Sequence, residues 1–149
     1  MAQNLDHLMV LNQSYFPIIQ QVREGSFKVP FTGKLNVLVN LFGKMLLNAV
    51  QPENRKKTKT FPVWEPTVSD IPGDVVERFV QHQTHLKQLI VSSTDLVAKD
   101  TVISSPANRW IVYRLATAFN ILIAHEQRHL EQSKEVLRLQ RSVASKAML

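Results

Sequence analysis

The sequence predicts an all-α protein, folded as a four-helix bundle. Apolar residues recur at helical spacing in four stretches, which cover residues 3–24, 34–50, 69–97 and 106–141. No stretch of consequence shows the strict alternation of apolar and polar residues that is typical of a half-buried strand. With 149 residues, the chain is long enough to bury a real core, and we expect one domain over residues 1–149.

The first expected helix covers residues 3–24 and has one apolar face. Pro17 lies inside it and should end or kink it locally, because proline lacks the backbone N–H that a helix interior needs. Gly25 supplies the stop. The second expected helix, residues 34–50, is apolar nearly all round, which favours a packed or partner-facing helix, and its Gly43 allows a close approach.

Residues 51–73 are expected to form a loop, since they include four prolines and a basic run. Phe61 and Trp64 would pin this loop to the bundle or, alternatively, cover a pocket. Ser69 marks the expected start of the third helix, which runs to about residue 97.

A loop is then expected over residues 95–105, before the last helix. Ser105 and Pro106 are typical of a helix start, with serine at the N-cap and proline at the first helical position. We therefore predict a fourth helix of about 35 residues, with Trp110 and Tyr113 in its opening turns.

Composition and charge narrow the classes of function. The formal net charge is +6, and part of the excess lies in residues 55–59 and 138–146. Neither segment has interleaved aromatic residues or a nucleic-acid motif, so we interpret them as a solvated loop and a basic helix end rather than a nucleic-acid interface. The absence of cysteine excludes disulfides and thiolate-held zinc. No signal peptide or apolar run of about 18 residues is present, which predicts a cytoplasmic protein without membrane contact.

His125 and His129 are the main candidate site residues. They lie four positions apart in the last expected helix, so both imidazoles stand on one face and can reach one metal ion. That face is apolar, with several residues within about 80° of His125 at roughly 100° per residue. These residues are Ile111, Leu115, Ala118, Leu122 and Val136. The alternative is a pair of hydrogen-bonded core histidines, although two stacked neutral rings are hard to satisfy in an apolar stripe.

Two other histidine patterns are weaker. His125-Glu126-Gln127-Arg128-His129 fits the H-E-x-x-H motif of zinc peptidases, but the downstream carboxylates lie too near on the same helix to complete such a site. His82 and His85 could also share a metal ion. We rank this pair lower because His85 is expected to face solvent.

Four segments of the chain form a further pattern. They are Leu5-Asp6-His7-Leu8-Met9-Val10-Leu11-Asn12, Ser14-Tyr15-Phe16-Pro17, Ser104-Ser105-Pro106 and Ala124-His125-Glu126-Gln127-Arg128-His129-Leu130-Glu131-Gln132. Together they resemble the DinB-like superfamily, which includes the YfiT-type metal hydrolases and the bacillithiol and mycothiol S-transferases. The resemblance covers nearly the whole chain, and its most specific part is the H-x-x-x-H-L-x-Q pattern of the last segment.

The resemblance implies a four-helix bundle that holds a divalent metal ion, nickel or zinc, on His7, His125 and His129. It also implies a metal-dependent thiol S-transferase or small-molecule hydrolase, with a low-molecular-weight thiol as possible cosubstrate. Glu126 and Gln132 are candidates for contacts behind the ligands. A non-catalytic bundle for oligomerisation or binding is the alternative.

The chain departs from the family pattern at its start. The family has a whole helix before the one with the first histidine, whereas His7 lies almost at the first residue here. We expect residues 34–50 or a second copy of the chain to take the place of that helix. An exposed bundle face would favour a homodimer.

Overall fold

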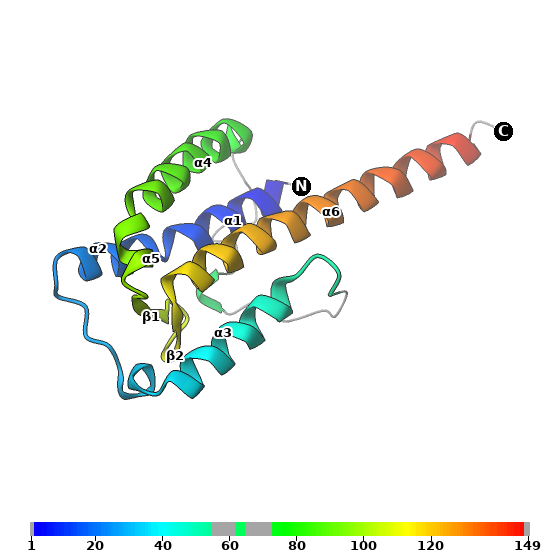
Figure 1. Ribbon diagram of the computed structural model, residues 1–149. Coiled ribbons are helices and arrows are strands. Elements are labelled where there is room, and N and C mark those ends of the chain that lie inside the picture. Colours follow the sequence, from blue (N-terminus) through cyan, green and yellow to red (C-terminus); the bar gives the residue numbers. More distant parts are fainter. Residues whose placement is uncertain (1, 55–61, 65–72, 148–149) are drawn as a thin grey trace.

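The computed structural model describes residues 2–54, 62–64 and 73–147, and it is mostly helical with one small two-stranded sheet (Figure 1). The helical class predicted from the sequence is therefore confirmed, but the prediction of a purely α-helical chain was wrong. The elements are α1 Ala2–Gln13, α2 Phe16–Arg23, the short 3₁₀ turn η1 Phe31–Lys34, α3 Asn36–Val50, the 3₁₀ turn η2 Pro62–Trp64, α4 Val75–Ser92, α5 Thr94–Ala98, β1 Val102–Ser105, β2 Asn108–Arg114 and α6 Leu115–Ala147.

The first predicted helix is divided where proline requires it. The chain leaves α1 at Gln13 and re-enters a helix at Phe16, with Pro17 in the first turn of α2, where its missing N–H has no intrahelical partner to lose. Gly25 follows α2 with a φ of 69°, a left-handed conformation that glycine adopts without strain. Both the predicted break and the predicted stop are confirmed.

Helix α3 lies alongside α6 and β2 (Figure 1), and Gly43 makes that packing possible. A Cβ at this position would lie 3.2 Å from Thr117 Cγ2 and 3.3 Å from Tyr113 Cβ, so a larger side chain would have to push these neighbours away. The predicted close approach at Gly43 is confirmed. The outer face of α3 stays open, with Val37 78% exposed and Leu41 56% exposed.

The segment predicted as the start of the last helix is instead a β-hairpin. Strands β1 and β2 pair antiparallel, and the register shifts between Ser104 and Ser105. The Ser105 hydroxyl does accept the N–H of Ala107, at 3.3 Å, but it begins a turn between strands rather than a helix. Trp110 and Tyr113 therefore lie on β2, and the helix begins at Leu115.

Burial explains why this segment forms a hairpin. Ile103, Val112 and Tyr113 have no exposed surface, and β-branched and aromatic side chains fit a pleated surface well. The N–H of Leu115 donates to the carbonyl of Thr101 at 2.8 Å, which fixes the hairpin to the first turn of α6. The same region corrects the predicted loop at 95–105, which holds α5 and β1. It also corrects the third helix, which ends at Ser92, while its predicted start at residues 69–72 lies outside the described part of the chain.

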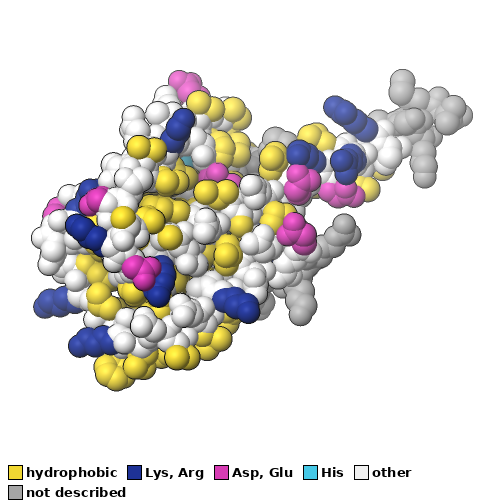
Figure 2. Space-filling view, viewed as in Figure 1, with side chains coloured by type: hydrophobic (Ala, Val, Ile, Leu, Met, Phe, Trp, Pro, Cys, Tyr) yellow, Lys and Arg dark blue, Asp and Glu magenta, His cyan; other side chains and the backbone are white. Residues whose placement is uncertain are grey.

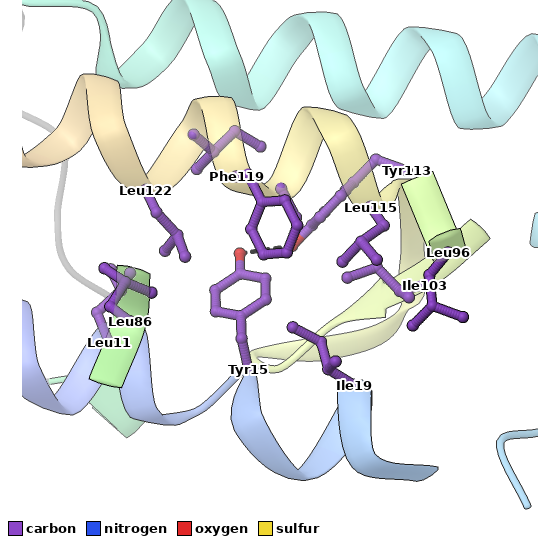
Figure 3. Close-up of a cluster of buried hydrophobic side chains, with 12 residues drawn as sticks. Leu11, Tyr15, Ile19, Leu86, Leu96, Ile103, Tyr113, Leu115, Phe119 and Leu122 are labelled. Carbon is purple, nitrogen blue, oxygen red and sulfur yellow. Dashed lines mark hydrogen bonds between the residues drawn. The ribbon is translucent and has the colours of Figure 1, made fainter. Parts of the chain in front are cut away.

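The core joins α1, α2, α4, α5, the hairpin and the first half of α6 (Figure 3). Tyr15 from the α1–α2 junction and Tyr113 from β2 meet there, and their hydroxyl groups share a hydrogen bond of 2.7 Å. Burial raises the pKa of Tyr113 to about 12 and raises the pKa of Tyr15 well above its usual value. Both phenols are therefore neutral structural groups.

The second half of α6 extends away from the rest of the molecule (Figure 1) and carries mixed charged and apolar side chains (Figure 2). Val136 is 53% exposed there, so the apolar face predicted for the last helix continues into solvent. Within the described ranges, no helix combines the length and the low polarity that crossing a bilayer requires.

Candidate metal centre

Three histidines from two helices converge in the interior. His7 comes from α1, and His125 and His129 come from successive turns of α6, which contacts α1. One ring nitrogen from each residue can be chosen so that all three lie within 4.8 Å of one another. The fold therefore brings together the three predicted ligands, although His7 is 118 positions from His125 in the sequence.

The two histidines of α6 face each other through equivalent atoms. Their Nε2 atoms are 3.2 Å apart, and the ring centroids are 4.7 Å apart with the planes at 82°. Two nitrogens at about 2.0–2.1 Å from one tetrahedral zinc ion would be about 3.3–3.4 Å apart. The Nε2 separation thus suits a shared ion as well as it suits a single hydrogen bond.

His7 completes the group and is oriented from behind. Its ring centroid lies 5.3 Å from each of the other two rings. Its Nδ1–H donates to the backbone carbonyl of Trp64 at 2.6 Å. This bond fixes the tautomer and leaves the Nε2 lone pair available, which is the usual arrangement behind a metal-binding histidine.

Trp64 is thereby shown to attach its segment to α1. Its indole Nε1–H donates to the Ser14 hydroxyl at 3.0 Å, and its carbonyl accepts the hydrogen bond from His7 Nδ1–H. The prediction that Trp64 pins the loop is confirmed, whereas its partner in that prediction, Phe61, lies outside the described residues. The carbonyl contact was not predicted, since no sequence pattern indicates a backbone acceptor from a distant loop.

The environment of His125 and His129 keeps these two rings neutral. The pKa of His125 is lowered to about 3, mainly by burial and in smaller part by the neighbouring His129, His7 and Arg128. Burial, His7 and Arg128 likewise lower the pKa of His129 to about 4. At neutral pH both rings are in the form that binds metal ions.

The Nδ1 atoms of His125 and His129 are buried and have no hydrogen-bond partner within the described part of the chain. Each ring therefore makes its polar contacts on the Nε2 side, where the three histidines meet. A cation between them would compensate part of the cost of burying these rings. The residues present thus fit a divalent ion held by three neutral imidazoles.

Glu126 and Gln132, predicted as contacts behind the ligands, lie elsewhere. Glu126 Oε1 accepts a hydrogen bond from Asn12 Nδ2 at 2.8 Å and one from Gln83 Nε2 at 2.6 Å, so this carboxylate joins α6 to α1 and α4. Gln132 is exposed. Among the described residues, neither Glu126 nor Gln132 hydrogen-bonds to the three histidines.

The two members of the second histidine pair lie in different environments. His82 is buried and stacks on Phe16 with a centroid distance of 5.9 Å, and burial lowers its pKa. His85 is exposed, as predicted. Within the described ranges, His7, His125 and His129 are the one group of three or more histidine, aspartate or glutamate side chains that lie close enough to hold a metal ion.

A pocket of about 410 Å³ adjoins the three-histidine group between α1, α4 and α6. His129 and Glu126 form part of its wall, together with Gln83, and the rest is largely apolar. The sequence did not predict this pocket or the contacts of Asn12 and Gln83 with Glu126. Isolated asparagine, glutamine and leucine residues have no distinctive spacing that would indicate such a site.

Comparisons of the chain with protein-family models, with curated proteins and with solved structures give no match.

Proposed function

We propose that this protein is a DinB-like metalloprotein that holds one divalent ion, nickel or zinc, on His7, His125 and His129, within a four-helix bundle formed by α1, α3, α4 and α6. The observation that carries the proposal is the convergence of three ring nitrogens within 4.8 Å, two of them 3.2 Å apart. Nitrogen ligands in this number are typical of catalytic zinc sites, which keep a position open.

The chemistry follows from the ligand set. A divalent ion held by three neutral imidazoles supplies Lewis acidity and lowers the pKa of a water or thiol bound to it. We therefore propose a metal-dependent thiol transfer or hydrolysis on a small molecule. This chain's own contribution is to orient His7 through the Trp64 carbonyl and to place a pocket beside His129.

A non-catalytic role in oligomerisation is the second candidate, and the outer face of α3 favours it. Val37, Leu41 and Met45 recur at helical spacing and are all at least half exposed. Apolar side chains also gather along the edge of the molecule where α3 lies (Figures 1 and 2). A homodimer through this face is compatible with either role.

Elemental analysis of the untagged protein, alone and after exposure to nickel or zinc, tests the metal centre. We expect about one ion per chain, loss of stoichiometric binding in His125→Ala and His129→Ala, and strong weakening in His7→Ala. His85→Ala is the matched control, because it removes an exposed histidine from α4 and should leave the metal content unchanged. No uptake of either metal, or equal uptake by the His125→Ala variant, would refute the proposal.

A further inference from the structure

The pocket beside the metal centre has the size of a small-molecule site. Its volume of about 410 Å³ lies within the range of about 300–1,000 Å³ that is usual for ligand pockets. Because His129 is in its wall, a molecule bound there would reach the three-histidine group. The pocket is therefore placed to hold the substrate of the proposed centre.

Most of the pocket wall is apolar. Leu5 and Leu8 contribute from α1, Phe79 from α4, and Ile123 and Leu130 from α6. Ile123 is 45% exposed and Leu130 is 54% exposed, although both belong to this concave surface. An apolar ligand would remove these side chains from water, which favours its binding.

Glu126 places a hydrogen-bond acceptor in the pocket wall. Glu126 uses Oε1 for its hydrogen bonds to Asn12 and Gln83, while Oε2 has no hydrogen-bond partner within the described ranges. The described lining includes no lysine or arginine that could balance this carboxylate. In the metal-free protein an anionic ligand would therefore meet an unfavourable charge, whereas a hydrogen-bond donor would meet an acceptor.

We infer that this pocket binds the apolar body of an uncharged or cationic small molecule whose donor group, such as a hydroxyl or an amine, lies against Glu126, and that in the metal-free protein it disfavours anions. This inference rests on the proposed function in one respect, namely that the bound molecule is the substrate of the metal centre. It narrows the substrate to an apolar donor-bearing class.

Three probes with the same ring and different head groups test the inference: 2-naphthylmethanol, 2-naphthylmethylamine and 2-naphthoate. Their affinities are measured by calorimetric titration of the full chain in the presence of a chelator, so that no metal contributes. We expect the alcohol and the amine to bind about tenfold or more tightly than the naphthoate, a difference of about 1.4 kcal/mol. Equal or tighter binding of naphthoate, or no binding of any probe, overturns the inference.

Variants locate the binding. Ser133→Trp places a large ring in the pocket wall and should weaken the alcohol and the amine about tenfold or more, and Leu130→Trp is the second variant if the first does not fold. Ser142→Trp makes the same change farther along α6, at an exposed position, and should leave both affinities unchanged. If probe affinity falls in both Ser133→Trp and Ser142→Trp, or in neither variant, the assignment of binding to this pocket is refuted.

Glu126→Gln separates charge from shape. It keeps an oxygen for Asn12 and Gln83 but removes the negative charge, so the preference of the amine over naphthoate should collapse. A preference that survives the substitution contradicts the role of Glu126. Metal content is measured separately on the same samples. Probe binding without metal uptake rejects the metal centre alone, and metal uptake without probe binding rejects the pocket alone.

Discussion

Replacement of Glu126 by alanine should destabilise the protein by about 3 kcal/mol, because one carboxylate oxygen holds three helices together. Glu126 on α6 accepts hydrogen bonds from Asn12 on α1 and Gln83 on α4, at 2.8 and 2.6 Å. A hydrogen bond to a charged group contributes about 1.5–3 kcal/mol, and the lower end applies here because the contacts are only partly buried. Asn12 has no exposed surface, so its amide would be left without this partner.

The measurement is urea unfolding followed by circular dichroism, in the presence of a chelator so that metal binding does not contribute. Gln83→Ala should lower the free energy of unfolding by about half as much as Glu126→Ala. The variant that combines the two substitutions should reveal a coupling energy of about 1.5 kcal/mol between Gln83 and Glu126. Glu135→Ala is the control on the same helix, since its carboxylate is exposed and its loss should stay within about 0.5 kcal/mol. A loss below about 1 kcal/mol for Glu126→Ala, or no coupling to Gln83, would refute the role of this carboxylate.

Two further predictions concern pH and the core. The pKa of His125 is lowered to about 3 in the folded protein, below the unfolded value of 6.5, so the unfolded chain binds more protons between these pH values. The free energy of unfolding of the metal-free protein should therefore be highest above about pH 6.5 and should fall as the pH drops toward 3. At pH 5 the loss from His125 should be about 2 kcal/mol, with a smaller part from the more exposed His129. The same pH dependence in wild type and His125→Ala, measured by urea unfolding, would contradict this. In the core, Tyr15→Phe should cost about 1 kcal/mol, because it removes one partner of the hydrogen bond between the two buried tyrosine hydroxyls. A free energy of urea unfolding equal to that of the wild type would show that this bond does not contribute to stability.

Hydropathy periodicity identified most of the helices, since an amphipathic helix repeats its apolar positions within a few residues. Helix α3 lies within the predicted range, and the break before α2 follows from the ring of Pro17. The spacing of His125 and His129 also fixed their common face before any tertiary contact was known.

The hairpin at residues 102–114 shows where local signals conflict. Ser105-Pro106 is typical of a helix start, but the same residues also suit a turn between two short β-branched and aromatic runs. The choice between a helix and a hairpin depends on Ile103 and Tyr113, which are completely buried where β2 packs against α3 and the core. Long-range packing thus overrode the local preference.

The sequence by itself determined the helical class, the break at Pro17 and the paired histidines of α6, because each depends on residues a few positions apart. The tertiary structure alone determined which residues lie around His125 and His129. It brought His7 within reach, placed the Trp64 carbonyl behind it, and tied Glu126 to Asn12 and Gln83. These contacts join residues 43 to 122 positions apart, and no local spacing encodes them. The pocket beside His129 has the same origin, since its walls come from three helices that meet only in the folded chain.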